Sequence, residues 1–198
     1  MRSRAAASIL HDAGFKKAYN MEGGINAWHG GVAEGPPEAG MAYFSSAVST
    51  EELIALAWML EDGNRRFYSD VTDLLSDKEA IKLFGELATA EEHHKSSLLN
   101  TYLEITGKQE DVDFPASVIG EKPDKDVMEG GMSVSEALKW ASGKELRDIL
   151  ELSISLETNA YDLYIKMARE SGDDKSKKVF SALAEEERHH LNRFSSLL

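Results

Sequence analysis

The chain has 198 residues, of which 42% are hydrophobic and 29% charged, and its formal net charge is −13. This length allows one sizeable hydrophobic core, or one core with a small appendage. The negative charge argues against nucleic acid and anionic membrane surfaces as partners, because both attract clusters of Lys and Arg. Cysteine is absent, which excludes disulfides, thiolate catalysis and cysteine-ligated metals. The sequence shows neither a run of about 20 apolar residues nor a signal peptide, so we expect a cytoplasmic protein.

Residues 1–40 differ in composition from the rest of the chain. They are rich in Gly and Ala, and the Gly- and Pro-rich stretch at 31–40 has the composition of a linker. Before it, residues 3–14 suggest a short amphipathic helix, and residues 15–24 suggest a brief strand followed by a turn. We therefore expect a short segment with a linker over 1–40 and a larger domain over 41–198.

From Ser49 onward, apolar residues recur at the spacing of α-helices. Four Ser-x-x-Glu sequences match the capping box, in which both side chains satisfy backbone N–H groups at a helix start. They are Ser49/Glu52, Ser76/Glu79, Ser133/Glu136 and Ser142/Glu145. We predict an all-α domain with long helices at about 50–74, 77–106, 143–170 and 174–197, and a short helix at about 134–141.

The order of these helices predicts a four-helix bundle built from two helical hairpins. Short connections join the first helix to the second and the third to the fourth, whereas residues 107–133 form one long crossover between the hairpins. An internal repeat supports this arrangement. A shift of 96 residues superposes Glu61 on Glu157, Tyr68 on Tyr164, Phe84 on Phe180, Leu87 on Leu183, Glu91 on Glu187 and His94 on His190.

The repeat contains two Glu-x-x-His pairs, Glu91/His94 and Glu187/His190. Because residues three positions apart lie on one face of a helix, the glutamate and histidine of each pair can bind the same metal ion. A single such pair is usually exposed and binds nothing. Two pairs in register, each with a further glutamate thirty residues upstream, favour a metal site instead.

The two upstream glutamates are Glu61 and Glu157, and all four glutamates lie in stretches whose apolar pattern places them on the inner face of a helix. Each buried, unpaired carboxylate costs several kcal/mol, and no Lys or Arg falls at a matching inward position. Two divalent cations would balance four carboxylates beside two neutral imidazoles. This oxygen-rich ligand set suits two iron ions, with manganese as the alternative.

Two further pairs of residues repeat with the same spacing. His93 and His189 fall about 100° away from the inward face, and we interpret them as surface or supporting residues. Tyr68 and Tyr164 lie two turns beyond the upstream glutamates on the same face. Each tyrosine either hydrogen-bonds a ligand carboxylate across the bundle, as a supporting residue of the catalytic site, or packs in the core with a polar tip.

The sequence over about 49–198 resembles the rubrerythrin group of the ferritin-like superfamily. The resemblance rests on Glu61 with Tyr68, EEHH at 91–94, Glu157 with Tyr164, and ERHH at 187–190. It implies a ferritin-like, usually dimeric bundle whose non-haem di-iron centre reduces hydrogen peroxide or handles dioxygen and ferrous iron. The ligands carried over are Glu61, Glu91, His94, Glu157, Glu187 and His190, with Glu91 and Glu187 as bridges between the metals.

Two departures from the rubrerythrin pattern affect the expected activity. The cysteines of a rubredoxin-like domain are absent, so we expect an external electron donor such as a rubredoxin-like protein. Ala160 stands one turn after Glu157, where rubrerythrins tend to carry an additional glutamate, and this weakens the assignment as a peroxidase. A ferroxidase or iron-handling protein, and a non-catalytic metal-stabilised module, are the alternative interpretations.

Residues 2–15 and 19–28 resemble, in this order, a helix and the closing strand and turn of a rhodanese domain. The catalytic cysteine of rhodaneses lies just upstream of the matching part. We therefore expect a truncated rhodanese-like segment without sulfurtransferase activity.

Overall fold

The structure is a computed structural model that describes residues 49–119 and 126–198. The predicted rhodanese-like segment and linker at 1–40 lie outside the described residues. Within those residues every regular element is a helix, and backbone pairing of the β type is limited to one isolated bridge between Val127 and Ser133. None of the described helices has the length and apolar character needed to cross a membrane.

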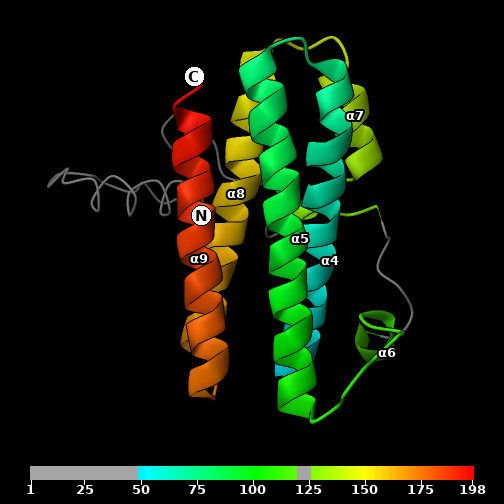
Figure 1. Ribbon diagram of the computed structural model, residues 1–198, viewed down its shortest axis with the longest axis vertical. Coiled ribbons are helices and arrows are strands. Elements are labelled where there is room, and N and C mark those ends of the chain that lie inside the picture. The colour runs from blue at the N-terminus through cyan, green and yellow to red at the C-terminus, as the bar shows by residue number, and fades with distance from the viewer. Residues whose placement is uncertain (1–48, 120–125) are drawn as a thin grey trace, which may run out of the picture.

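Four long helices run side by side (Figure 1) and form the predicted bundle: α4 at Thr50–Val71, α5 at Lys78–Thr106, α8 at Leu146–Glu170 and α9 at Asp174–Ser195. The closest packing joins α4 to α5 and α8 to α9, which are the two hairpins of the internal repeat. A 3₁₀ turn, η1 at Thr72–Leu74, extends α4 toward the first hairpin loop. The prediction of an all-α, ferritin-like bundle is confirmed.

Helix starts follow local capping, and two of the four predicted capping boxes are wrong. Ser49 and Glu52 form the complete box at the start of α4, and the Ser133 hydroxyl accepts the Glu136 N–H at the start of the short helix α7, Val134–Ala141. The cap of α5 is Asp77, whose carboxylate accepts the Ala80 N–H at 2.8 Å, so that the preceding serine caps nothing. Ser76 and Asp77 are adjacent residues that can both cap a helix, and Asp77 is the N-cap.

Ser142 ends a helix rather than starting one. Its backbone N–H donates to the Leu138 carbonyl, and Gly143 follows with φ at +85°, a left-handed conformation that commonly ends helices. Helix α8 therefore starts at Leu146, three residues later than predicted, with Glu145 as its N-cap.

The crossover between the hairpins contains three short elements. They are α6 at Ala116–Ile119, which the sequence did not predict, η2 at Glu129–Gly131, and α7, and Figure 1 shows α6 and α7 beside the bundle on the side of α4. The crossover approaches α4 at Gly63, where an added Cβ would lie 2.1 Å from the Val127 carbonyl oxygen and 2.7 Å from the Met128 Cα. Only a residue without a side chain fits there.

Two hydrophobic clusters fill the bundle at different heights along the helices. One includes Ile54, Leu98, Tyr164 and Phe180, and the other includes Phe67, Tyr68, Phe84 and Phe194. On α4 the first cluster ends at Leu60 and the second begins at Phe67, so the predicted ligand Glu61 lies where the clusters meet. The polar site is thus enclosed by apolar side chains above and below.

We expect Gly63→Ala to destabilise the protein by about 1–3 kcal/mol, because the added methyl group meets the backbone of the crossover. Gly85→Ala is the matched control: Gly85 is an exposed helical glycine with no atom within 4 Å of an added Cβ. That substitution should instead stabilise by up to about 1 kcal/mol. Denaturant unfolding measures both changes, and a Gly63→Ala protein as stable as the Gly85→Ala protein would contradict the close approach.

Candidate metal centre

The structure brings all six predicted ligand residues together at the centre of the bundle. Glu61 lies on α4, Glu91 and His94 on α5, Glu157 on α8, and Glu187 and His190 on α9, and every one of them is buried. The helical register explains this convergence, because each residue continues the apolar inner face of its helix.

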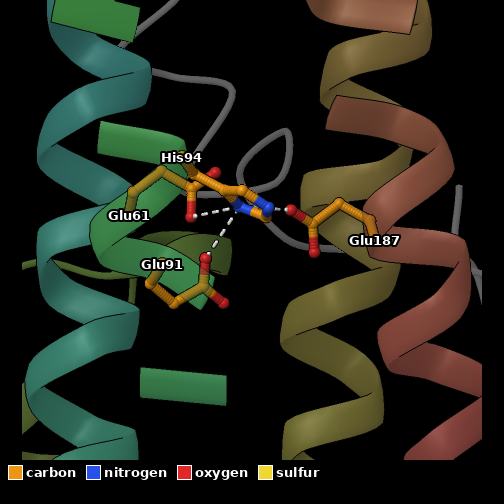
Figure 2. A group of neighbouring side chains, drawn as sticks. All are labelled: Glu61, Glu91, His94 and Glu187. Atoms are coloured by element: carbon orange, nitrogen blue, oxygen red, sulfur yellow. Dashed lines mark ion pairs between the residues drawn. The ribbon is translucent and has the colours of Figure 1, made fainter. Parts of the chain in front are cut away.

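The six residues form two overlapping groups that could each hold a metal ion. In the first group, Glu61, Glu91, His94 and Glu187 offer ligand atoms within 4.8 Å of one another, and in the second, Glu91, Glu157, Glu187 and His190 do so. Glu91 and Glu187 belong to both groups. Figure 2 shows the first group, in which side chains from three helices converge on one ring nitrogen of His94.

The Nδ1 atom of His94 lies close to three carboxylates without forming a hydrogen bond to any of them. Its Nδ1 lies 2.9 Å from Glu91 Oε2, 3.0 Å from Glu187 Oε1 and 3.6 Å from Glu61 Oε2. None of these contacts has the alignment of a hydrogen bond, so Nδ1 and both carboxylate oxygens of Glu91 lack hydrogen-bond partners. The atoms face a common centre instead of facing one another.

The other ring nitrogen of His94 is fixed by a carboxylate outside the predicted set. Nε2 lies 2.8 Å from Glu186 Oε2, and the Glu186 side chain is 55% exposed. When Nε2–H donates to this carboxylate, the Nδ1 lone pair is free for a metal, which is the usual arrangement of a histidine ligand. The sequence did not predict this role of Glu186. The predicted ligands were found because they repeat after 96 residues, and the residue equivalent to Glu186 is Ala90.

His190 completes the second group, and its Nδ1 forms a hydrogen bond with Glu157 Oε2 there. Its Nδ1 lies 3.1 Å from Glu157 Oε2 and 3.3 Å from Glu187 Oε2. The rings of His94 and His190 stack with centroids 5.4 Å apart and planes inclined by 17°. The two histidines therefore flank the shared carboxylates and serve one group each.

The carboxylates lack the partners that buried charges require. Glu61 Oε2 and both oxygens of Glu91 and of Glu187 are buried without a hydrogen bond. Such groups cost several kcal/mol each unless a cation or a proton compensates them. Four carboxylates with two imidazoles form an oxygen-rich donor set that fits two iron or manganese ions.

Two tyrosines cross the bundle to reach the carboxylates of the other hairpin. The hydroxyl of Tyr68 on α4 donates to Glu157 Oε1 on α8, and the hydroxyl of Tyr164 on α8 donates to Glu61 Oε1 on α4. Both tyrosines are fully buried. The structure shows the cross-bundle hydrogen bond of one interpretation together with the core packing of the other, and each bond ties one hairpin to the other.

Burial and neighbouring charges raise the pKa values of several groups in the site. Burial, reinforced by the charge of Glu187, raises the pKa of Glu157 to about 8. Burial alone would lower the pKa of His190, but the carboxylates of Glu157 and Glu187 raise it to about 10. Burial and the charges of Glu61 and Glu187 also raise the pKa of Glu91 well above its usual value. These shifts favour the protonated forms of Glu91, Glu157 and His190.

The remaining candidate residues differ in whether their side chains are buried. His93 and His189 are exposed, as predicted, and their neighbours His94 and His190 are buried. Ala160 lies in the core and offers no ligand atom. A further buried carboxylate, Glu129 in the crossover, was missed because irregular chain has no periodicity from which burial can be inferred.

Comparisons with known proteins agree with this geometry. A family model described as rubrerythrin matches residues 52–198. Over 55 residues, the chain is 42% identical to a protein of Pyrococcus furiosus described as a ferritin-like-encapsulin shell fusion protein. That match covers 28% of this chain and 16% of the relative, so the chain corresponds to a small part of it. No solved structure matches the chain.

We expect the metal-free protein to lose stability as the pH rises from 6.5 to 8. In this window Glu157 and His190 retain protons in the folded protein that they release in the unfolded chain, because their folded pKa values, about 8 and about 10, exceed the ordinary 4.5 and 6.5. The loss is at most about 1.4 kcal/mol per pH unit for each proton. Thermal unfolding after chelation measures it, and a melting temperature that rises over this window would contradict the assignment.

Proposed function

Because the chain belongs to the rubrerythrin family, we propose that it is a di-iron oxidoreductase that reduces hydrogen peroxide with electrons from an external donor. The observation that carries the proposal is the pair of overlapping ligand groups that share Glu91 and Glu187. Two ions that share two carboxylates are held close enough to act on one small substrate.

In this proposal the six residues have distinct positions. Glu61 and His94 would hold one ion and Glu157 and His190 the other, while Glu91 and Glu187, which belong to both groups, would be available to both ions. When bound, two ferrous ions supply two electrons, which with two protons convert hydrogen peroxide into two water molecules and leave both ions ferric.

The protein supplies orientation and exclusion of water. The hydroxyls of Tyr68 and Tyr164 hold the terminal carboxylates Glu157 and Glu61 in one orientation. The apolar clusters above and below exclude bulk water from the reacting atoms. The contact between His94 Nε2 and the half-exposed Glu186 fixes the orientation of the His94 ring and leaves Nδ1 directed at the site.

The electrons have to come from another molecule in this proposal. The chain contains no cysteine and therefore no rubredoxin-type iron site. We propose an external one-electron donor, such as a rubredoxin-like protein, that restores the ferrous pair after each turnover.

A second candidate is oxidation of ferrous iron, in which iron is the substrate. The similarity to a protein described as ferritin-like favours it. So does the net charge of −13, because an acidic surface attracts cations. The same six residues would serve both reactions.

Metal analysis of protein from iron-supplemented cells should give about two ions per chain. We expect His94→Ala to lose about half of this metal or more, because His94 supplies the nitrogen of one group. His93→Ala is the matched control, an exposed histidine one residue away, and should retain the full content. A metal content near zero in the unaltered protein would refute the di-metal proposal.

Stopped-flow mixing distinguishes the two reactions. In the peroxidase case, anaerobic ferrous protein consumes about one peroxide per pair of irons, and a rubredoxin-like donor sustains turnover. In the ferroxidase case, the protein oxidises many ferrous ions per chain with dioxygen. If the metal-loaded protein does neither but unfolds on metal removal, it is a metal-stabilised module and the catalytic proposal fails.

A further inference from the structure

Glu129 is a buried carboxylate that belongs to none of the four long helices. It lies in the crossover, at the start of η2, and is only 2% exposed. One side of its carboxylate is held by the Gly130 backbone N–H, whereas Oε1 is buried without any hydrogen-bond partner. Glutamate is almost never fully buried unless it is paired, so its position requires an explanation.

The backbone around Glu129 is fixed between α4 and α8 at the height of the metal centre. Its N–H donates to Asn64 Oδ1, 3.2 Å away and one turn after Glu61 on α4. The next residue, Gly130, faces α8: an added Cβ would lie 2.7 Å from Asn159 Nδ2, two residues after Glu157. Gly130 has φ at +75°, so glycine is needed there both for the left-handed turn and for the close approach.

The Glu129 carboxylate also lies within electrostatic range of the centre. Burial and then the charges of Glu61, Glu187 and Glu157, in this order, raise its pKa. The charge of Glu129 in turn contributes to the raised pKa of Tyr164, whose hydroxyl donates to Glu61. The hydrogen bond of its backbone N–H to Asn64, one turn after Glu61, places Glu129 beside the α4 residue of the first ligand group.

The charge and coordination of the metal pair provide a reason for a further carboxylate at this position. Each ligand group offers four residues, fewer than the six ligands of an octahedral ion, so a divalent ion there already accommodates a further oxygen ligand. The four predicted glutamates neutralise two divalent ions, and oxidation to a ferric pair adds two more positive charges inside an apolar core. A fifth carboxylate beside the pair would compensate one of them. Ferric iron, as a harder cation, also favours an additional oxygen ligand.

We propose that Glu129, which belongs to neither ligand group in this structure, turns its side chain to become a fifth carboxylate ligand and binds the ion held by Glu61 and His94. This proposal rests on the proposed di-metal site. It makes the two metal positions inequivalent, because the internal repeat provides one ligand set for each ion and the crossover adds Glu129 to one of them only.

Glu129→Gln tests the proposal, because it removes the charge while keeping the shape of the side chain. Glu110→Gln, an exposed residue of the same crossover, is the matched control. Titration with Co²⁺, followed by its visible absorption, reports affinity and coordination without reference to activity. We expect the unaltered protein and Glu110→Gln to bind two ions, and Glu129→Gln to bind one of them about tenfold more weakly or worse, with an altered spectrum.

The outcomes separate this proposal from the one on which it rests. Two ions in the unaltered protein, with identical affinity and spectrum in Glu129→Gln, would overturn the role of Glu129 and leave the di-metal site intact. No bound ion in the unaltered protein would overturn both. If circular dichroism shows that Glu129→Gln is unfolded, a crystal structure of the Co²⁺-loaded unaltered protein decides, since Glu129 must then contact a metal ion.

Discussion

Mutual repulsion among the carboxylates of Glu61, Glu91, Glu157 and Glu187 is the constraint around which the bundle is organised. Each is buried in an apolar core, where repulsion is much stronger than in water. Burial, and after it the charges of neighbouring carboxylates, raises the pKa values of Glu91 and Glu157, which favours their protonated forms when no cation is bound. The metal-free fold therefore stores an unfavourable free energy that two bound cations would release.

The rest of the structure holds these groups in place despite their repulsion. Each hairpin contributes a Glu-x-x-His pair and an upstream glutamate, and each sends a tyrosine across to the glutamate of the other hairpin. The centre thus forms only when the hairpins are packed together. Glu186 breaks the approximate twofold repeat, since it contacts His94 and the residue one repeat earlier is Ala90.

The sequence predicted the parts of this arrangement that follow from periodicity. The four long helices and the inward direction of six ligand positions came from apolar spacing and from the 96-residue repeat. Capping was harder to predict because adjacent polar residues compete for one helix start, as Asp77 did with the serine before it.

Contacts across irregular chain could not be predicted at all. Glu129 lies in a crossover without periodicity, and its burial depends on the close approach at Gly63 on another element. The exposed Glu186 contacts His94 only because α9 packs beside α5. Such contacts are set by tertiary packing, on which local sequence carries little information.

Electron paramagnetic resonance of the oxidised, iron-loaded protein tests the central claim most directly. Two ferric ions that share the Glu91 and Glu187 carboxylates couple their spins, so the bound iron should give almost no signal of isolated ferric ions. Chemical analysis of the same sample has to account for the iron. A signal of isolated ferric iron equal to the total iron content would contradict a shared centre.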